Sequence, residues 1–306
     1  MVEEKFIFQI DSPIVKRYFD SPNFIIDYAS GSEVENDLCA IYFSSNEIYY
    51  PNTNSAFEYS IVRRNKFEWR YNKFPNARKH IFLRDLRKQW YIGGINSQLD
   101  DISKLEEFLK QETKGFRIYT IGSSAGGYAS ILLGSLLNAE RVYAFNSQFN
   151  LFKIIEESCI MVNPILFDEK YNSIFNQYFD LSNFVKPNID YFYFQSIFSN
   201  EDRRQFDCMS DIAKKNISLI RFKTSKHGFP VLKTNIPILL SYDKSQLDYL
   251  VNKIFHPIIF SIKLEGYLLT LKSILNALYN KVYKIYISYL HQGQLDYFIK
   301  FYKYFD

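Results

Sequence analysis

Residues 116–137 read FRIYTIGSSAGGYASILLGSLL, and this stretch decides the fold. Its first part, Phe116–Ile121, is short, apolar and rich in β-branched and aromatic residues, which predicts a buried strand. From Tyr128 to Leu136 the apolar side chains recur at helical spacing, which predicts a helix. The glycine-rich residues 122–127 join the two parts. A strand that turns directly into a helix is a building unit of α/β sheets.

The turn itself carries chemistry, because residues 122–126 match the G-x-S-x-G pattern of a nucleophile elbow. In that motif the serine, here Ser124, lies on a strained turn, and the two glycines leave room for the adjacent strand and helix. The helix that begins there directs backbone N–H groups and its positive dipole end at an oxyanion. A glycine-rich turn that binds a phosphate or nothing is the other interpretation. The strand–turn–helix context and a further glycine, Gly127, favour the elbow.

Composition limits the classes of protein to consider. A chain of 306 residues with 47% hydrophobic residues suits one large domain, or one domain with an appendage. The low counts of 11 glycines and 9 prolines argue against linkers and disorder. A net charge of +4, without a nucleic-acid-binding motif, does not indicate a nucleic-acid partner.

Cysteine usage and the N-terminus indicate a cytoplasmic protein. Cys39, Cys159 and Cys208 are odd in number and scattered, which predicts free thiols in a reducing compartment. The first residues, MVEEKFIFQIDSP, have acids where a signal peptide needs basic residues, and no uncharged run is long enough to span a bilayer. The chain has no HExxH motif, CxxC pair or aspartate cluster, so we expect no metal site.

The rest of the chain alternates strands and helices. Apolar runs predict strands at Lys5–Ile10, Phe24–Tyr28, Leu38–Phe43, His80–Leu83, Arg141–Phe145, Ile189–Phe194 and Ile217–Phe222. Helical periodicity predicts a helix over about residues 100–112. We therefore expect an α/β fold with a mostly parallel central sheet flanked by helices, in a domain of residues 1–244.

Two stretches interrupt this alternation. Residues 150–188 predict short helices without an obvious strand, either a cap over a pocket or a helical excursion without a role. Residues 47–79 are aromatic and basic, and they suit the wall of a carbohydrate or acyl pocket. Packing of loops and short helices on a sheet edge is the favoured interpretation of 47–79, since most loops are not binding sites.

A serine nucleophile needs a histidine base, and the chain has few candidates. A serine hydroxyl reacts poorly near neutral pH unless a histidine takes its proton. In enzymes with this elbow the order along the chain is serine, acid, histidine, with the last two after later strands. His80 precedes the elbow, and His256 and His291 lie in a helical tail. His227 alone follows a predicted strand downstream of the elbow, so we predict His227 as the base.

The acid is expected after the preceding strand, where Asp202 lies. Glu201 is its nearest competitor, and Asp207 and Asp211 are less well placed. Acids in surface loops are usually solvated, but the ordered combination with Ser124 and His227 favours a catalytic role for Asp202.

An oxyanion hole needs two N–H donors. Ala125 follows the nucleophile and supplies one, and the loop after the strand Leu38–Phe43 supplies the other, from Ser44 or Ser45. An ordinary polar turn explains Ser44 and Ser45 equally well, because small polar residues dominate turns.

These features resemble the α/β-hydrolase superfamily over about residues 24–240. The resemblance rests on the Gly122-x-Ser124-x-Gly126-Gly127 motif, Asp202 and His227-Gly228. More narrowly, Arg84-Asp85, Trp90-Tyr91-x-Gly93 and Ala144–Gln148 are similar to hydrolase-like proteins found with bacterial surface-polysaccharide genes, some of which are O-acetyltransferases of capsular sugars. The chain departs from lipases and esterases in lacking an HGGG-type oxyanion motif.

The resemblance implies acyl transfer through Ser124, either as an O-acetyltransferase with acetyl-CoA as acyl donor or as an esterase. It implies a surface polysaccharide or glycan precursor as substrate, and Arg84, Trp90 and Tyr91 as substrate-binding residues. No tightly bound cofactor is expected. Whether water or a sugar hydroxyl receives the acyl group depends on how well the site excludes water.

The sequence pattern changes at residue 245, and residues 245–306 predict a helical C-terminal appendage. Apolar residues recur at helical spacing from Leu264 to Tyr289, and lysines alternate with tyrosines and phenylalanines. Docking of this apolar stripe on the main domain is the favoured interpretation. A surface for a membrane or a protein partner is the alternative. In the rival functional hypothesis the protein is a non-catalytic, hydrolase-like subunit of a polysaccharide or secretion assembly that docks through this appendage.

Overall fold

The computed structural model describes residues 6–279 and residue 282. The chain divides into two compact units, Met1–Pro257 and Ile258–Asp306. The first unit extends beyond the predicted boundary at residue 244, because it includes α12 (Lys244–Asp248) and a short strand at Ile254–Phe255.

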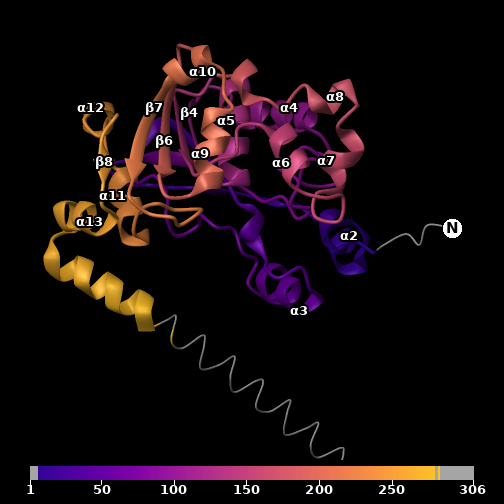
Figure 1. Cartoon of the computed structure of the whole chain (residues 1–306), viewed down its shortest axis with the longest axis horizontal. Coiled ribbons are helices and arrows are strands. Elements are labelled where there is room, and N and C mark those ends of the chain that lie inside the picture. The colour runs from indigo at the N-terminus through magenta and orange to yellow at the C-terminus, as the bar shows by residue number, and fades with distance from the viewer. Residues whose placement is uncertain (1–5, 280–281, 283–306) are drawn as a thin grey trace, which may run out of the picture. The chain divides into compact units, whose positions relative to one another are not determined.

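An eight-stranded sheet organises the first unit, in the order β1-β3-β2-β4-β5-β6-β7-β8 (Figure 1). The strands are β1 (Phe24–Tyr28), β2 (Glu35–Phe43), β3 (Ala77–Leu83), β4 (Arg117–Ser123), β5 (Arg141–Phe145), β6 (Asp190–Ser196), β7 (Ile217–Phe222) and β8 (Ile254–Phe255). Only β1 runs antiparallel to its neighbour, with Ile26 opposite Ile81, and the other pairings are parallel. The predicted α/β fold with a mostly parallel sheet is confirmed.

Both faces of the sheet are covered, by layers of different chemistry. Helices α4 (Ile102–Glu112) and α5 (Ala125–Leu136) contribute to a core of aliphatic and aromatic side chains, together with alternate residues of β2 such as Ile41 and Phe43. The opposite face of β2 carries Tyr42, whose ring stacks on Phe82 at 4.5 Å in an aromatic layer. These continuous buried runs are typical of strands in a parallel sheet covered on both sides.

The parallel arrangement gathers the functional loops. The carboxyl ends of parallel strands meet at one edge of a sheet, and ligands of α/β proteins bind there. Figure 1 shows the carboxyl ends of β6 and β7 at the lower edge. The segments that follow β2, β3, β4, β5, β6 and β7 therefore leave the sheet at this same edge.

Short helices fill the two stretches that interrupt the alternation. Residues 150–188 form α6 (Leu151–Glu157), α7 (Pro164–Glu169), α8 (Ser173–Asn176) and η3 (Leu181–Asn183), as the sequence predicted. Residues 46–63 form η1 (Asn46–Ile48), α3 (Asn54–Phe57) and the π-helical η2 (Glu58–Arg63). A small separate core joins these to the N-terminal segment through Val15, Ile48, Phe57 and Leu86.

Three local differences from the sequence prediction stand out. The run Lys5–Ile10 was predicted as a strand, but its residues 8–10 lie in α1 (Phe8–Asp11), where the Asp11 carboxylate accepts the Ile7 N–H at 2.6 Å and closes a turn. Helix α2 (Pro13–Phe19) follows. The polar segment after β6 is helix α9 (Asn200–Asp207), not a loop. Strand β8 lies beyond the last predicted strand.

The remaining elements are α10 (Asp211–Lys215), η4 (Lys233–Asn235), α11 (Ile236–Leu240) and, reaching into the second unit, α13 (Pro257–Glu265). Gly266, with φ of +84°, separates α13 from helical residues 267–279. Within the described residues, none of the helices has the length and hydropathy needed to cross a membrane. The predicted helical positions Ile285 and Tyr289 lie outside the described residues.

Candidate active site

Ser124 lies on a strained turn between β4 and α5. Its φ of 52° and ψ of −123° place it in a region that residues other than glycine rarely adopt. Its N–H donates to the Phe145 carbonyl at 2.9 Å, which fixes the turn against β5. A Cβ at Gly122 would lie 2.0 Å from the Gly126 carbonyl oxygen, and one at Gly126 would lie 2.3 Å from the Phe43 carbonyl oxygen. Both glycines are therefore required sterically, as a nucleophile elbow demands.

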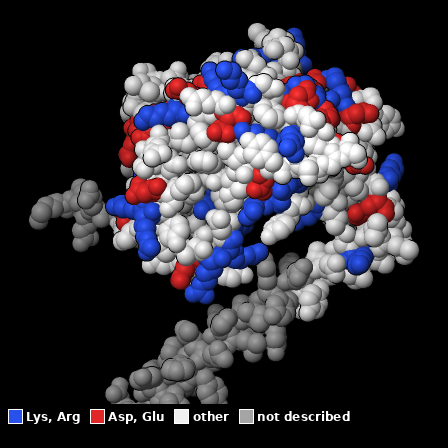
Figure 2. All heavy atoms as spheres, turned by 180° about the vertical axis from the view of Figure 1, so that it is seen from behind, with Lys and Arg blue, Asp and Glu red and all other residues white. Residues whose placement is uncertain are grey.

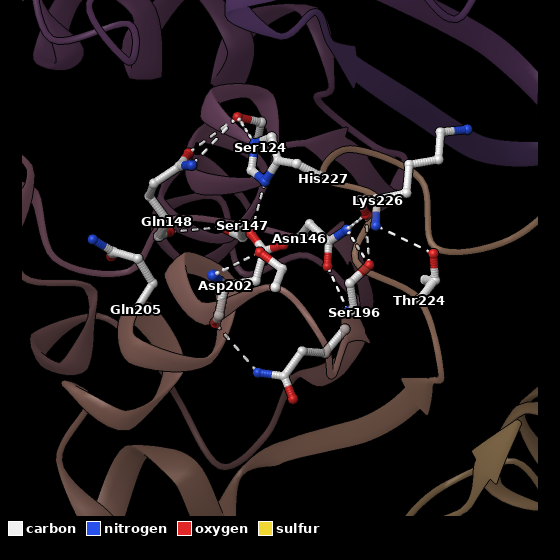
Figure 3. Close-up of polar contacts among 12 residues, drawn as sticks. Ser124, Asn146, Ser147, Gln148, Ser196, Asp202, Gln205, Thr224, Lys226 and His227 are labelled. Atoms are coloured by element: carbon white, nitrogen blue, oxygen red, sulfur yellow. Dashed lines mark hydrogen bonds and ion pairs between the residues drawn. The ribbon is translucent and has the colours of Figure 1, made fainter.

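His227 reaches Ser124 from the loop after β7. Its Nε2 lies 2.8 Å from Ser124 Oγ (Figure 3). The loop is held from two neighbouring strand ends, since the Lys226 carbonyl accepts hydrogen bonds from Asn146 Nδ2 at 3.0 Å and from Ser196 Oγ at 2.6 Å. The histidine is thus positioned by side chains that leave β5 and β6 at the same edge of the sheet.

Asp202 completes a chain of hydrogen-bonding groups. Its Oδ1 lies 2.8 Å from His227 Nδ1, and its side chain is only 1% exposed. Asp202 belongs to the first turn of α9, where its N–H donates to the capping Ser199 hydroxyl at 3.3 Å. Among the competing acids, Glu201 and Asp211 are exposed. The structure therefore brings together the three side chains that the sequence nominated.

The environment of His227 tunes its basicity. Burial alone would lower the pKa of the imidazole, but the hydrogen bond and charge of Asp202, with smaller effects of Glu201 and Glu47, raise the pKa above its ordinary value of 6.5. The Nδ1 edge faces the buried carboxylate while 37% of the side chain stays exposed. This arrangement can take a proton from Ser124 and stabilise the resulting imidazolium.

Of the predicted oxyanion donors, only Ala125 is well placed. It is the first residue of α5, so its N–H has no acceptor within the helix. The Ser44 N–H donates to the Leu83 carbonyl at 3.0 Å, and the Ser45 N–H donates to Glu68 Oε2 at 2.7 Å. Both backbone donors are therefore occupied, and neither is free for an oxyanion in this structure.

Two of the three predicted substrate-binding residues have structural partners instead. Arg84 is buried against the Phe67 ring, with its guanidinium carbon 4.4 Å from the ring centre, and its Nε donates to Asn23 Oδ1 at 3.1 Å. Tyr91 is fully buried, and its hydroxyl donates to the Ser44 carbonyl at 2.9 Å. Burial leaves Arg84 and Tyr91 no surface for a substrate, so these two predictions are not supported.

Trp90 lies next to the site because a buried aspartate shapes its loop. The Asp85 carboxylate accepts the backbone N–H groups of Arg87, Lys88, Gln89 and Tyr91 at 2.6–3.0 Å. These bonds hold Lys88, Trp90 and Tyr91 at positive φ. The indole Nε1 of Trp90 then donates to Gln148 Oε1 at 3.1 Å.

Gln148 is the site residue that the sequence prediction missed. Its Nε2 lies 3.3 Å and its Oε1 3.4 Å from Ser124 Oγ, and Figure 3 shows the amide pointing toward Ser124. The available signal was its position just after β5, at the edge where the other site residues lie.

Among the described residues, no three His, Cys, Asp or Glu side chains are grouped as metal ligands.

The strand order, the antiparallel outer strand β1 and the serine on the turn after β4 define an α/β-hydrolase fold. No protein-family model matches the chain, and no curated protein matches its sequence.

Several solved structures of enzymes align with the chain. The capsule O-acetyltransferase of Neisseria meningitidis serogroup A aligns at 15% identity over 65% of this chain and 82% of its own, with a TM-score of 0.43. The esterase domain of a Rhodothermus marinus protein aligns at 8% identity over 73% and 91%, with a TM-score of 0.42. An S-formylglutathione hydrolase from Staphylococcus aureus aligns at 8% identity over 76% and 96%, with a TM-score of 0.45. Because these TM-scores lie below 0.5, the fold assignment rests on the strand order and the elbow.

Proposed function

We propose that the protein is a serine-dependent acyl-transfer enzyme that forms an acyl-enzyme on Ser124. The observation that carries the proposal is the pair of 2.8 Å contacts that link Ser124 Oγ, His227 and Asp202. A nucleophile, a base and an orienting acid in this arrangement form the working parts of a serine hydrolase or transferase.

The reaction follows from the geometry. Ser124 Oγ bonds to the acyl carbonyl carbon while its proton moves to His227 Nε2, and the Asp202 carboxylate stabilises the imidazolium. The Ala125 N–H donates to the oxyanion. When the bond to the leaving group breaks, His227 returns the proton to that group. A hydroxyl of the acceptor then attacks the acyl-enzyme by the same steps in reverse, and His227 takes its proton.

We propose acetyl-CoA as the acyl donor and a surface polysaccharide or glycan precursor as the acceptor. The sequence resemblance of residues 84–93 and 144–148 supports this choice. Cations beside the site support it further, because CoA carries several phosphate groups. Lys226 precedes His227, and burial together with the charge of Lys233 lowers the pKa of Lys226. Figure 2 shows Lys and Arg side chains along the lower part of one face, toward the edge where β6 and β7 end in Figure 1.

A fluorophosphonate probe tests the nucleophile, since it labels only serines that a neighbouring base activates. We expect labelling of the wild type and of Ser123→Ala, whose serine ends β4 one residue earlier, and none of Ser124→Ala. Equal labelling of Ser124→Ala and the wild type would overturn the proposal.

The donor and the acceptor need a second experiment. Release of free CoA thiol from acetyl-CoA is measured with and without a saccharide acceptor, and acetylated product is quantified. Thiol release that depends on the acceptor identifies a transferase. Hydrolysis of simple acetyl esters without use of acetyl-CoA identifies an esterase and contradicts the choice of donor.

A further inference from the structure

We infer that Gln148, oriented by Trp90, is a fourth polar member of the site that holds Ser124 Oγ for attack, an inference that rests on the proposed acyl-transfer function. Its side-chain amide contacts the reacting oxygen from a strand end that supplies none of the three triad residues. The amide is also buried, with Gln148 only 3% exposed, so its hydrogen bonds are not diluted by solvent.

Trp90 settles which end of the amide faces Ser124. An indole N–H can only donate, so the Gln148 atom that lies 3.1 Å from Trp90 Nε1 must be the oxygen. Nε2 is therefore the donor that lies 3.3 Å from Ser124 Oγ. Oε1 keeps a second lone pair and lies 3.4 Å from the same oxygen. Trp90 in turn is held in place by the loop that the Asp85 carboxylate orders.

A donor at this position fixes the direction of the serine proton. Ser124 Oγ carries one hydrogen and two lone pairs. When the Gln148 N–H occupies a lone pair, the hydroxyl hydrogen can point at His227 Nε2, 2.8 Å away, or at Gln148 Oε1, 3.4 Å away, and the shorter contact favours His227. The same N–H stabilises the negative charge that develops on Oγ when it leaves as the acyl group passes to the acceptor.

At Ser44 and Ser45, the loop after β2 supplies no free backbone donor to the site. The N–H groups of Ser44 and Ser45 donate to other acceptors, so the site lacks the second backbone donor that the sequence suggested. Gln148 supplies a side-chain donor at Ser124 Oγ. A glutamine that served only to pack would not need its oxygen pinned by an indole N–H.

The decisive variant is Gln148→Glu, which keeps the shape but places a carboxylate oxygen beside Ser124. The carboxylate accepts the serine proton in competition with His227, and its charge raises the pKa of His227. We expect the rate of fluorophosphonate labelling to fall about 10-fold or more, and the acid limb of its pH profile to move to higher pH. A wild-type rate with an unmoved limb would overturn the inference.

Two further variants separate a role at Ser124 from a role in folding. Gln148→Ala should lower the labelling rate about 10-fold, and Trp90→Phe, which removes the indole N–H but keeps an aromatic ring in the buried position, should lower it less. In the double variant the Trp90→Phe change should have no further effect, because its target is gone. Full additivity would contradict the inference. Gln98→Ala, an exposed glutamine away from the site, is the control and should label like the wild type.

The outcome is separable from that of the proposed function. If Ser124→Ala labels like the wild type, the acyl-transfer proposal itself fails. If labelling depends on Ser124 but Gln148→Glu and Trp90→Phe behave like the wild type, only the role of Gln148 fails. Thermal unfolding of each purified variant shows whether a lost rate reflects lost folding, and the isosteric Glu variant keeps the test valid if Gln148→Ala does not fold.

Discussion

The charge on Asp202 determines the pH range in which His227 can act as a base. His227 must be neutral to accept the serine proton, and its pKa lies above 6.5 because of the hydrogen bond and charge of Asp202. The rate of acylation should therefore fall as the pH drops through this raised pKa. The acid limb is expected to have its midpoint above 6.5, and a fluorophosphonate labelling profile from about pH 5 to 9 measures it.

Replacement of Asp202 by Asn tests this cause. The amide removes the charge that raises the pKa of His227, so the acid limb should move to lower pH. The amide also favours the wrong imidazole tautomer, and the labelling rate at neutral pH should fall by about 1,000-fold or more. Glu201→Gln, a change at the exposed neighbouring acid, should leave the rate nearly unchanged. An acid limb that stays in place in Asp202→Asn would show that another group sets it.

Lysines beside His227 predict a salt-dependent contribution to donor binding. Lys226 and Lys233 lie close enough for the charge of Lys233 to lower the pKa of Lys226. In the double variant Lys226→Gln, Lys233→Gln, we expect the KM for acetyl-CoA to rise about 3- to 10-fold with kcat unchanged. Steady-state kinetics at two salt concentrations test this, and the difference should shrink at high salt. Lys215→Gln, in α10, is the matched control, and a KM equal to that of the wild type in the double variant would refute the prediction.

Single residues of the site were predictable where a local motif or the chain order constrains them. Ser124 follows from the elbow, and His227 and Asp202 follow from the order of strands. Ser44 and Ser45 could not be assessed from sequence, because the Glu68 carboxylate that occupies the Ser45 N–H is distant along the chain. Gln148 belongs to the stretch that carries the family resemblance, but its role at the site was not predicted, since only the tertiary fold brings Trp90 to it.

At the scale of elements, the glycines of the elbow set the distance between β4 and α5. A Cβ at Gly122 would lie 2.0 Å from the backbone oxygen of Gly126, and backbone cannot move aside cheaply. We expect Gly122→Ala to lower the free energy of unfolding by about 2–4 kcal/mol and to abolish labelling of Ser124. Urea unfolding measures the first effect.

Gly115→Ala is the control for this prediction. Gly115 precedes β4 with φ of +83°, and a Cβ there meets nothing within 4 Å. Its replacement should cost only the strain of a positive φ, about 1–2 kcal/mol, and leave labelling intact. Equal losses of stability in the two variants would mean that the close approach at Gly122 does not matter.

Helices and strands were predictable where the run of buried apolar residues is long enough to show a clear pattern. Strands such as β5 and β7 match their predicted bounds, because continuous apolar runs are flanked by polar turns. Helix α9 was hidden by its polar composition, NEDRRQFD, although Ser199 caps it. Strand β8 has only two residues, too few for any alternation to show. The N-terminal run from Lys5 was mistaken for a strand because so short an apolar run fits a strand or a helix equally well.

At the scale of the whole molecule, the parallel sheet brings the site together. Ser124 follows β4, Gln148 follows β5, Asp202 follows β6 and His227 follows β7, and these four strands are consecutive in the sheet. Each residue therefore reaches the same edge from an adjacent strand, although Ser124 and His227 are 103 positions apart in the sequence. Parallel strands with right-handed crossovers make such a gathering the ordinary outcome.

All four of these residues and the whole sheet belong to the first unit, Met1–Pro257, which predicts that this unit suffices for the chemistry. We expect a chain that ends at Pro257 to fold and to label with a fluorophosphonate at the rate of the full chain, because the large hydrophobic cluster around β2, α4 and α5 has no described member beyond Leu219. Labelling rates and thermal unfolding of the two chains test this.

A chain that ends at Tyr242 is the matched comparison. It lacks α12 and β8, and β8 pairs with β7 at Arg221 and Phe222, so this shorter chain should be less stable. If the chain that ends at Pro257 folds but does not label, the second unit contributes to the site. If it labels normally, the alternative interpretation of residues 245–306 as a surface for a membrane or a protein partner can be tested separately from catalysis.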